Sequence, residues 1–589
     1  MRCPGSPAVN RALERARASL SSSWHRRPRH PFAAALSALF LFLLSVATSA
    51  QPARGARGMV ATVQPLATEA GVAALRHGGN AVDAAIAAAL TLGIVDGHNS
   101  GLGGGCFLLL RLRSGEVVAI DGREKAPGAA TRAMFVSEGK ADPRLSQTGA
   151  LASGVPGALA AYEYAARHYG KLPLAVHLRA AAEVAARGFP LDRAYAGRLA
   201  ATAEDLRRFP SSHAVYFKSD QSLPKAGESF MQPDLAKTYR SIAERGTDWF
   251  YRGPFARQTA AWMKDNGGLL SARDFAAYRP VLREPIRTRY RGCEIVGFPP
   301  PSSGGIHVAQ ILNILEHFDL RKLGAGSPDL MHVVIEAMKL AFADRAYWLG
   351  DPDFARVPRG LVSEDYGAQL ARRIDLEHAS KVAGHDTPPQ DSTELFGRHT
   401  THFSAVDADG NWAAVTATLN TSFGSKVVVP GTGVVLNNQM DDFSIQPGVA
   451  NAFGLVGADA NAVAAGKRPL SSMSPTIVLR EGRPVLALGA AGGPTIISQV
   501  LLTLIHVIDF GLPLDQALAQ PRFHHQWQPD EVRIERRAGD AIVQELQRRG
   551  HRVVVVESIG AAQAVAFDPA TRQFTGGADP RGEGSAAGP

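Results

Sequence analysis

The sequence predicts a layered α/β fold and not a doubly wound parallel sheet. Residues 81–95 are apolar nearly all round apart from Asp83, a pattern typical of a helix buried on every side. The stretch from Pro156 to about Asp353 is mostly helical in its spacing of apolar residues. After residue 400 apolar residues recur at every second position, which indicates strands, and a helix and further strands follow. Blocks of helices and strands in this order favour stacked layers.

The composition is that of a globular protein. With 589 residues the chain is too long for one ordinary core, and it has room for about two to four domains or one large α/β assembly. Hydrophobic residues make up 45% and charged residues 20%, which excludes global disorder, collagen and coiled coil. Three cysteines build neither a disulfide framework nor a four-cysteine zinc site, so Cys106 and Cys293 are predicted to be buried thiols.

The net charge of +9 does not indicate a nucleic-acid-binding protein. Residues 1–50 hold seven arginines and one glutamate, a net charge of +6. Subtracting these from the totals of 63 basic and 54 acidic residues leaves 56 basic and 53 acidic residues in the rest of the chain. Such a balanced body lacks the basic surface that DNA or RNA requires, so no nucleic-acid partner is expected.

The first fifty residues are predicted to be a secretory signal peptide. Arg26, Arg27 and Arg29 precede an uncharged run from Pro31 to Ala50, which ends in small residues. A basic region, an apolar region and a small-residue exit are the three parts of such a signal. An uncleaved membrane anchor is the alternative, because about twenty residues just span a bilayer. We expect cleavage near Ala50 and an exported mature protein, either periplasmic or secreted.

Two helices and a glycine-rich loop are predicted next. The helices run over 65–76 and 81–95, and the loop Asn99–Cys106 leads into a strand over 107–113. This loop resembles a phosphate loop only superficially, since Cys106 stands where a glycine is required and no Gly-Lys-Ser/Thr follows. We therefore exclude nucleotide binding and expect the glycines to permit close approach of another backbone segment.

A stiff turn and a polar linker divide the region that follows. The turn Pro299–Gly305 opens one helix, and a second helix is predicted over Leu330–Trp348, which includes Glu336 and Arg345 among its apolar residues. Residues 382–399 are polar, contain proline and show no period. This composition is typical of an exposed, protease-sensitive linker.

A hairpin is predicted directly after the linker. Its strands, 400–406 and 412–420, flank a loop in which Gly410 suits the left-handed position of a three-residue connection with a bulge. Such a loop makes Thr400 face Thr418, whereas a two-residue loop would place Thr401 there. Further elements are expected as strands near 427–436, 476–480 and 485–489 and as a helix from Pro494.

The common catalytic and metal-binding motifs are missing from the sequence. There is no HExxH, no GxSxG and no pair of CxxC motifs, and His524-His525 is interpreted as a packing or surface pair. No metal ion or cofactor is therefore expected. The run Asn437–Phe443 is dense in amides and acids, and it either holds an ammonium group through several acceptors or forms a polar turn.

A threonine at the start of a strand, after a cleavable linker, points to a further chemistry. A threonine hydroxyl is a poor nucleophile unless a base lies beside it, and cleavage before Thr400 would make its own α-amine that base. The pKa of a free α-amine, about 7.7–8.0, already lies near operating pH. Thr400-Thr401 alone is weak support, because threonine is a common strand residue.

Several segments, in order along the chain, form one recognisable set. They are NSGLGGGCF at 99–107, DGREKAP at 121–127, PPPSSGG at 299–305, the stretch from Thr400 to Ser444, KRPLSSMSPT at 467–476, GAAGGPTII at 489–497 and GADPRGEGSAAG at 577–588. This set resembles the γ-glutamyltransferase family, and the stretch from Thr400 to Ser444 resembles the start of the family's small subunit. The whole similarity runs from about residue 58 to the end of the chain.

The resemblance implies a fold and a maturation step. Family members are N-terminal-nucleophile hydrolases, whose α/β (α+β) fold is a four-layer αββα sandwich with two stacked antiparallel sheets. They process themselves, which makes His399–Thr400 the expected processing bond. The products would be a large subunit of residues 51–399, ending in the linker 382–399, and a small subunit of residues 400–589 that stays bound to it.

The resemblance also implies which residues catalyse the reaction. Thr400 would be the nucleophile for self-cleavage and for γ-glutamyl transfer, and Thr418 would hydrogen-bond to it. Gly492 and Gly493 would supply the backbone N–H groups of an oxyanion hole, where such donors act most strongly on the tetrahedral intermediate.

The substrate's glutamyl end is a zwitterion, and the resemblance implies groups for both charges. Arg123, assisted by Ser471 and Ser472, would bind the α-carboxylate, since a guanidinium fork suits a planar carboxylate. The residues expected to receive the α-ammonium group are Asn420, Gln439 and Asp442.

The activity implied is that of a γ-glutamyltransferase, also called glutathione hydrolase. Its partners would be glutathione and other γ-glutamyl compounds as donors, and amino acids, peptides or water as acceptors. A glutaryl or cephalosporin acylase of the same fold is one alternative, although glutaryl lacks the ammonium group that Asn420, Gln439 and Asp442 would receive. An unprocessed, non-catalytic binding relative is the other.

One position departs from the pattern of bacterial family members. Residues 445–454, IQPGVANAFG, resemble their lid loop, in which a tyrosine often reaches the site asparagine. This chain has Phe453 at that place, so the hydroxyl group of the lid is missing. We expect this change to affect closure of the lid and not the chemistry.

Overall fold

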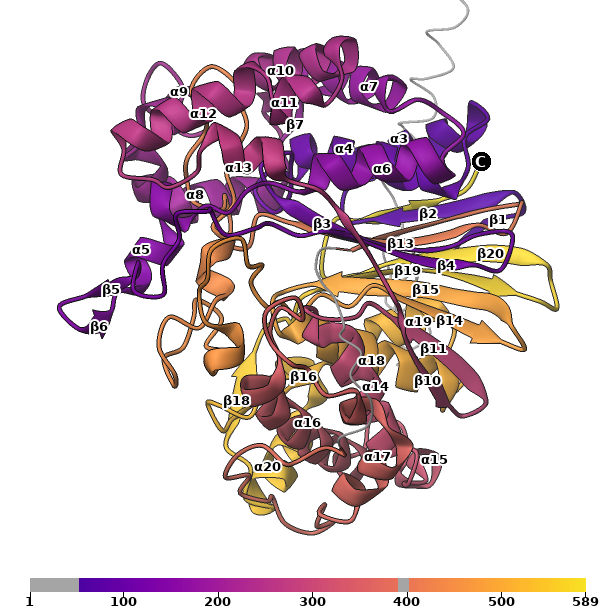
Figure 1. The fold of residues 1–589 in the computed structure, drawn as a ribbon. Helices are drawn as coiled ribbons and strands as arrows, with labels where there is room; N and C mark the ends of the chain where they lie inside the picture. The colour runs from indigo at the N-terminus through magenta and orange to yellow at the C-terminus, as the bar shows by residue number, and fades with distance from the viewer. Residues whose placement is uncertain (1–51, 390–401) are drawn as a thin grey trace, which may run out of the picture. The chain divides into compact units, whose positions relative to one another are not determined.

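The computed structural model describes residues 52–389 and 402–589. Two seven-stranded sheets pack against each other, and helices cover the outer face of each (Figure 1). Neighbouring strands within each of these two sheets are antiparallel. The order of layers is helix, sheet, sheet, helix, which confirms the layered α/β fold predicted from the sequence.

The upper sheet in Figure 1 contains the hairpin predicted after the linker. Its strand order is β21-β2-β12-β13-β3-β4-β9. β12 and β13 are buried along their whole length, so the chain that follows residue 402 runs through the centre of the molecule. The strands are β2 Gly58–Thr62, β3 Gly105–Arg111, β4 Val117–Gly122, β9 Val281–Arg283, β12 Phe403–Asp407, β13 Trp412–Thr418 and β21 Ser585–Ala587.

The lower sheet has the strand order β1-β20-β19-β15-β14-β11-β10. Its central strand β15 contacts both β12 and β13 of the upper sheet, which closes the core between the two layers. The strands are β1 Ala53–Gly55, β10 Ile286–Tyr290, β11 Cys293–Gly297, β14 Thr476–Arg480, β15 Arg483–Ala491, β19 Ala561–Asp568 and β20 Gln573–Ala578.

Helices from the first half of the chain cover the upper sheet (Figure 1). α3 and α4 have the predicted bounds, and every residue of α4 is buried, as its apolar sequence predicted. Asn80 and Asp83 form a reciprocal cap that fixes the start of α4. The helices are α3 Pro65–Arg76, α4 Ala81–Val95, α6 Ala158–Tyr169, α7 Leu174–Arg187, α8 Arg193–Arg207, α9 Pro210–Tyr216, α10 Pro233–Arg245, α11 Asp248–Tyr251, α12 Pro254–Asp265 and α13 Ala272–Ala277.

Helices from both the middle and the end of the chain cover the lower sheet. The helix after the proline turn begins at Ser303 and not, as the turn Pro299–Gly305 suggested, after Ile306, because the Ser302 hydroxyl accepts a hydrogen bond from the N–H of Gly304 at 2.9 Å. These helices are α14 Ser303–Leu315, α15 Leu320–Leu323, α16 Pro328–Trp348, α17 Glu364–Ala371, α18 Thr495–Ile508, α19 Leu514–Ala519 and α20 Asp540–Arg548.

The β12–β13 hairpin has the register that a three-residue loop predicts. Phe403 pairs with Val415 and Val406 with Trp412, and Gly410 has a φ of 91°, in the left-handed region that favours glycine. A two-residue loop would shift every pair by one position and is therefore wrong. The predicted pair of Thr400 with Thr418 continues this register but includes a residue outside the described part of the chain.

The region predicted to be mostly helical is so, with α6 to α16, but it also contains the unpredicted strands β9, β10 and β11. β10 alternates buried and exposed residues, the period of a strand. The expectation for residues 427–436 needs correction. Residues 427–436 do not form ladder strands. They make a tight reversal with one bridge, Val428 to Val435, because Pro430 and the glycines after it favour a turn.

Several short helices and strands lie outside the two large sheets. A small apolar cluster that includes Phe135, Met440, Phe443 and Ile445 fixes the chain directly after the acid-rich run. The short elements are β5 Val136–Ser137, β6 Lys140–Ala141, α5 Pro143–Gln147, β7 Phe189–Pro190, β8 Ser229–Phe230, β16 Phe523–His524, β17 Val532–Glu535 and β18 Val553–Val556.

The state of the cysteines agrees with the sequence analysis. Cys106 and Cys293 are free and buried, as predicted. Within residues 52–389 and 402–589, no helix has both the length and the apolar character needed to cross a membrane. The predicted signal peptide lies outside the described residues.

Candidate active site

One cavity, of about 270 Å³, brings together the predicted site residues. It lies at the end of β13, where the chain leaves the upper sheet, and beside the glycine-rich start of α18. Of the predicted residues that the structure describes, all except Arg123 line it. The predicted residues on its wall are Thr418, Asn420, Gln439, Asp442, Ser471, Ser472, Gly492 and Gly493. His399 and Thr400 lie outside the described residues.

Arg123 lies directly behind the cavity wall and is completely buried. Its Nη2 donates to Asp442 Oδ2 at 2.5 Å, and its Nη1 lies 3.5 Å from Glu124 Oε2. Burial raises the pKa of Glu124 to about 7. Burial also raises the pKa of Asp442, although the nearby Arg123 guanidinium opposes that rise. Arg123 therefore orients the Asp442 carboxylate, which does face the cavity.

Arg345, on α16, supplies a cation on the cavity wall that the sequence analysis did not assign. Its Nε donates to Ser303 Oγ at 3.0 Å and its Nη2 to Ser472 Oγ at 3.2 Å. Burial lowers its pKa to about 10, so it remains a cation at neutral pH. A charged residue inside a buried helix was the sequence signal that could have identified it.

Three side chains at the end of β13 form a polar wall. The backbone N–H of Asn420 donates to Thr418 Oγ1 at 2.7 Å, and Asn420 Nδ2 donates to the Asn438 carbonyl at 3.0 Å. Gln439 Nε2 donates to Asp442 Oδ2 at 3.0 Å. Among the described residues, the buried Oε1 of Gln439 has no hydrogen-bond partner. It is an acceptor held ready for a ligand donor.

Gly492 and Gly493 connect β15 to α18 in conformations that suit glycine, with φ angles of 134° and 59°. The carbonyl of Gly492 accepts a hydrogen bond from Thr495 Oγ1 at 2.8 Å, and that of Gly493 accepts one from the N–H of Ile496. No group in the described ranges accepts a hydrogen bond from either glycine N–H. Two unpaired amides that border a cavity are a suitable site for an oxyanion.

The serine pair lies between Arg345 and the proline turn. The N–H of Ser303 donates to the Ser471 carbonyl at 3.0 Å, and the Ser303 hydroxyl donates to the same oxygen at 2.7 Å. The Ser472 hydroxyl accepts the hydrogen bond from Arg345 Nη2. These contacts fix the Ser471 backbone and the Ser472 side chain in the cavity wall.

The expected lid segment, residues 445–454, reaches the cavity through Phe453. A Cβ added to Gly493 would lie 2.6 Å from the Phe453 ring, so the ring packs closely on that glycine. The N–H of Ala452 donates to Asp441 Oδ2 at 2.9 Å, and Gln526 Nε2 donates to the Phe453 carbonyl at 3.2 Å. The segment is thus held over the glycine pair from two sides.

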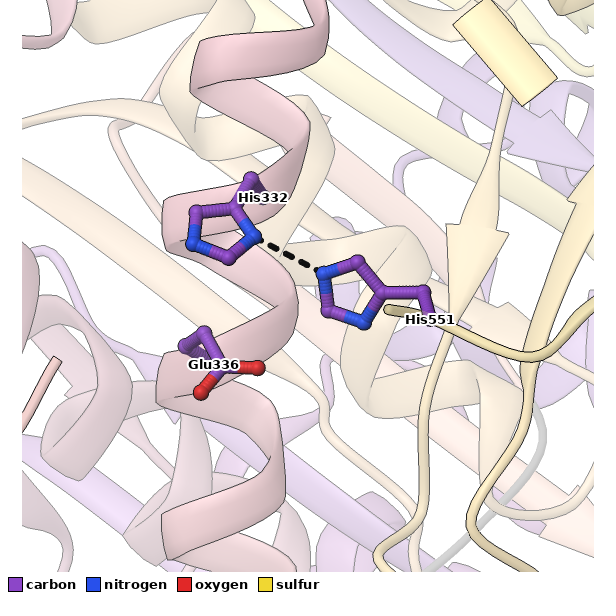
Figure 2. A group of neighbouring side chains, drawn as sticks. All are labelled: His332, Glu336 and His551. Carbon is purple, nitrogen blue, oxygen red and sulfur yellow. Dashed lines mark hydrogen bonds between the residues drawn. The ribbon is translucent and has the colours of Figure 1, made fainter. Parts of the chain in front are cut away.

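A second group of buried side chains has the spacing of metal ligands. His332 and Glu336 on α16 and His551 after α20 have candidate ligand atoms within 4.8 Å of one another (Figure 2). Several of their polar atoms are engaged without an ion, because His332 Nδ1 lies 2.8 Å from His551 Nε2 and Lys339 Nζ lies 2.8 Å from Glu336 Oε1, whereas the buried Nδ1 of His551 has no hydrogen-bond partner among the described residues. A metal ion would have to displace the ammonium group of Lys339. We therefore interpret His332, Glu336 and His551 as a contact that joins α16 to the segment after α20.

His524 and His525 are both buried, which agrees with packing and not with a surface position. His524 Nδ1 lies 2.5 Å from Ser498 Oγ, and His525 Nε2 lies 3.1 Å from Asp530 Oδ1. Each ring is therefore engaged by a different neighbour.

Comparison with known proteins agrees with this geometry. The family model described as gamma-glutamyltranspeptidase matches residues 67–589. The chain belongs to the gamma-glutamyltranspeptidase family. The glutathione hydrolase proenzyme of Escherichia coli (strain K12) is 45% identical over 536 residues, which cover 90% of this chain and 91% of that protein.

Two acylases are also similar to this member of the family. The acylase ACY 1 proenzyme of Pseudomonas sp. (strain SE83) is 38% identical, with 91% of this chain and 94% of that protein covered. The crystal structure of cephalosporin acylase from Bacillus halodurans has a TM-score of 0.82 at 30% identity and covers 97% of this chain and 99% of that one. The N-terminal-nucleophile hydrolase fold implied by the sequence is thereby confirmed.

Proposed function

We propose that this chain is an autoprocessed γ-glutamyltransferase and glutathione hydrolase. It cleaves the γ-glutamyl amide of glutathione and related compounds, and it passes the γ-glutamyl group to water or to an amino acid or peptide. The observation that carries the proposal is the convergence, on one cavity wall, of Thr418, the ammonium acceptors, a buried cation and the unpaired glycine amides.

Maturation would occur at the bond between His399 and Thr400. The Thr400 hydroxyl attacks the preceding carbonyl, and hydrolysis of the resulting ester leaves subunits of residues 51–399 and 400–589. The new α-amine of Thr400 is then the base for its own hydroxyl. Residues 1–50 would direct the precursor out of the cytoplasm before they are removed.

In the reaction, Thr400 Oγ attacks the γ-carbonyl carbon of the donor and loses its proton to the α-amine. The N–H groups of Gly492 and Gly493 stabilise the oxyanion that forms. The C–N bond then breaks, and the proton passes from the α-amine to the departing nitrogen. A water molecule or an acceptor amine attacks the γ-glutamyl ester, and its proton restores the Thr400 hydroxyl.

Recognition of the glutamyl group would divide its two charges between two parts of the wall. The α-carboxylate fits beside Arg345 and the hydroxyl groups of Ser471 and Ser472, with Arg123 behind them. The α-ammonium group fits the acceptors of Asn420, Gln439 and Asp442. Gln439 Oε1, which has no partner among the described residues, would gain one when the ammonium group binds.

A glutaryl amide acylase is the second candidate, since two relatives are named as acylases. Glutaryl compounds lack an α-ammonium group and would leave the buried Gln439 Oε1 without a donor, which is costly in a buried site. The acid and amide wall therefore favours γ-glutamyl substrates.

Two measurements on purified protein, electrophoresis and an anilide release assay, separate these functions. Electrophoresis should show two chains, whereas a non-catalytic relative would remain a single chain. The processed protein should release p-nitroaniline from γ-glutamyl-p-nitroanilide, faster with glycylglycine present, and much more slowly from the glutaryl anilide. Faster release from the glutaryl compound would replace the transferase assignment with the acylase.

A further inference from the structure

The cavity has a buried end and an exposed end, and each end has an arginine. At the buried end lie Arg345 and Asp442, which are 4% and 8% exposed. At the other end lies Arg198 on α8, whose side chain is exposed, together with the partly exposed Asn99 and Ser422. Arg198 belongs to the segment that would become the large subunit, whereas most of the wall comes from residues after 402.

In the described part of the chain, Arg198 has no acidic partner, in contrast to Arg123, and its guanidinium also lacks the serine contacts that hold Arg345. Among the described residues, no carboxylate oxygen lies within 4.0 Å of its guanidinium nitrogens. The acid on the neighbouring segment, Asp96, is engaged elsewhere, because its Oδ1 accepts from Asn99 Nδ2 at 3.0 Å and lies 3.4 Å from His98 Nδ1. Asp96 therefore acts on Arg198 only through its field and not through an ion pair, and a cation at a cavity mouth without a paired carboxylate is available to an anionic ligand.

The size of the cavity determines which part of a substrate meets Arg198. Its volume of about 270 Å³ is at the small end for ligand sites, which span about 300–1,000 Å³. Under the proposed function, the γ-glutamyl group fills the buried end. The atoms beyond the scissile amide must then extend toward the mouth. A dipeptide reaches roughly 7 Å when extended, so its C-terminal carboxylate points toward the exposed end.

We propose that Arg198 binds the C-terminal carboxylate of the dipeptide that leaves glutathione and of the peptide that accepts the γ-glutamyl group. This inference rests on the proposed function and adds the chemical class of the second ligand: amines that carry a carboxylate. In the transfer step the acceptor nitrogen forms a bond to the γ-carbonyl carbon, the ester bond to Thr400 breaks, and the acceptor's proton goes to Thr400 Oγ. Arg198 holds the carboxylate during this exchange, a task that suits its planar fork of donors.

The test compares acceptors that differ only in charge. Glycylglycine and glycylglycinamide are offered to the γ-glutamyl enzyme formed from γ-glutamyl-p-nitroanilide, and the ratio of their KM values is measured. Wild type should prefer glycylglycine, and Arg198→Gln should raise the glycylglycine KM by roughly one and a half- to fivefold, as expected for one exposed ion pair, so that the preference disappears. Arg193→Gln removes an exposed arginine from the first turn of the same helix, away from the cavity, and should keep the wild-type ratio.

The leaving group gives a second, independent readout. The kcat/KM ratio for glutathione against glutathione with an amidated glycine should fall in Arg198→Gln by a factor similar to that for the acceptors. Arg198→Glu should reverse the preference in both assays, because it repels the carboxylate. Arg198→Lys should keep part of the preference, since the charge remains and the fork is lost.

The outcomes distinguish this inference from the proposed function. If wild type releases p-nitroaniline but both ratios are unchanged in Arg198→Gln and Arg198→Glu, the role of Arg198 is wrong and the function stands. If wild type already treats the free and the amidated ligands alike, the inference is also overturned. If the processed wild type releases nothing from any γ-glutamyl compound, the function itself fails.

Discussion

Helix α16 carries one buried charge near its C-terminus and another near its middle, and the two have different partners. Near its C-terminus, Arg345 borders the cavity, and its hydrogen bonds go to the hydroxyl groups of Ser303 and Ser472. Near the middle, Glu336 is held by Lys339 Nζ at 2.8 Å and by the N–H of Ser380 at 3.0 Å. Both charges are almost inaccessible to water, but only Glu336 has an opposite charge within bonding distance.

The difference shows how a site can be recognised among buried polar groups. A buried ion without a partner is costly, so the fold retains it only where a ligand or a nearby field compensates. The group of His332, Glu336 and His551 resembles a metal site by distance (Figure 2). The charge of Glu336, however, is already balanced by the ammonium group of Lys339. Arg345 has no carboxylate in salt-bridge distance among the described residues, so we expect a ligand to bind at the wall around it.

The largest expected effect is at the nucleophile. Thr400→Ala should remain a single uncut chain and lose γ-glutamyl-p-nitroanilide release by about 10⁴-fold or more, because both the hydroxyl and the route to a free α-amine are lost. Electrophoresis and the release assay measure the two consequences. Thr400→Ser keeps the hydroxyl and should still process. Normal processing of the alanine variant would transfer the role to another residue, with Thr401 the first to test.

Removing the ion pair near the middle of α16, Glu336 with Lys339, should lower the stability of the protein and leave catalysis unchanged. Lys339→Met leaves Glu336 as a buried carboxylate without its ammonium partner, which costs about 3–5 kcal/mol. Thermal unfolding should occur at a clearly lower temperature, while kcat/KM of the remaining folded enzyme stays near that of wild type. A large loss of kcat/KM with unchanged unfolding would mean that the group of His332, Glu336 and His551 belongs to the catalytic machinery. The proposed difference between Glu336 and Arg345 would then be wrong.

A change at Arg345, near the C-terminus of α16, should instead lower catalysis and leave stability nearly unchanged. Arg345→Lys keeps the charge but loses one of the two serine contacts, and a hydrogen bond to a charged group contributes about 1.5–3 kcal/mol. The expected loss in kcat/KM for γ-glutamyl-p-nitroanilide is therefore roughly ten- to a hundredfold. The unfolding temperature should change little. Full activity in this variant would remove Arg345 from the substrate-binding wall.

The histidine group also predicts a dependence of stability on pH. Burial lowers the pKa of His551 to about 3, and the charged or titratable groups that face it are His332, Lys339, His525 and Asp530. The unfolded chain binds a proton at His551 near pH 6.5 and the folded chain does not, so stability is full above that pH. It falls by up to about 1.4 kcal/mol per unit as the pH drops from 6.5 toward 3.

His551→Gln tests this dependence, because the amide still donates to His332 Nδ1 but does not titrate. Thermal unfolding of both proteins between about pH 7 and about pH 5 gives the comparison. The variant should lose stability less steeply than wild type. Equal slopes would show that His551 titrates alike in the folded and unfolded chains.

Local patterns in the sequence were enough to predict much of the fold. The bounds of α3 and α4 follow from a proline start, an asparagine cap and apolar spacing. The register of the β12–β13 hairpin follows from Gly410. The strands β9 to β11 were missed because they are short and follow a long helical region, although the alternation in Ile286–Tyr290 was visible.

The site was less predictable where its contacts join distant segments. The placement of Asn420, Gln439 and the glycine pair around one cavity agrees with the implied set. Arg345 was visible only as a charge in a buried helix, since its partner Ser472 lies more than a hundred residues away. The pairing of His332 with His551 was invisible for the same reason, because no spacing within one element encodes it.

The smallest expected effect concerns the lid. The ring of Phe453 packs on Gly493 and borders the cavity, but it has no hydroxyl to donate to Asn420. A net hydrogen bond contributes about 0.5–1.5 kcal/mol, so Phe453→Tyr should tighten closure without changing the chemistry. Because closure limits the access of water to the γ-glutamyl enzyme, the ratio of hydrolysis to transfer should shift by roughly two- to tenfold while formation of that enzyme changes less. A glycylglycine titration of both proteins measures the ratio. An unchanged ratio would mean that the lid closes through ring packing alone, and that the contact of Phe453 with Gly493 already does what the tyrosine hydroxyl does in relatives that carry it.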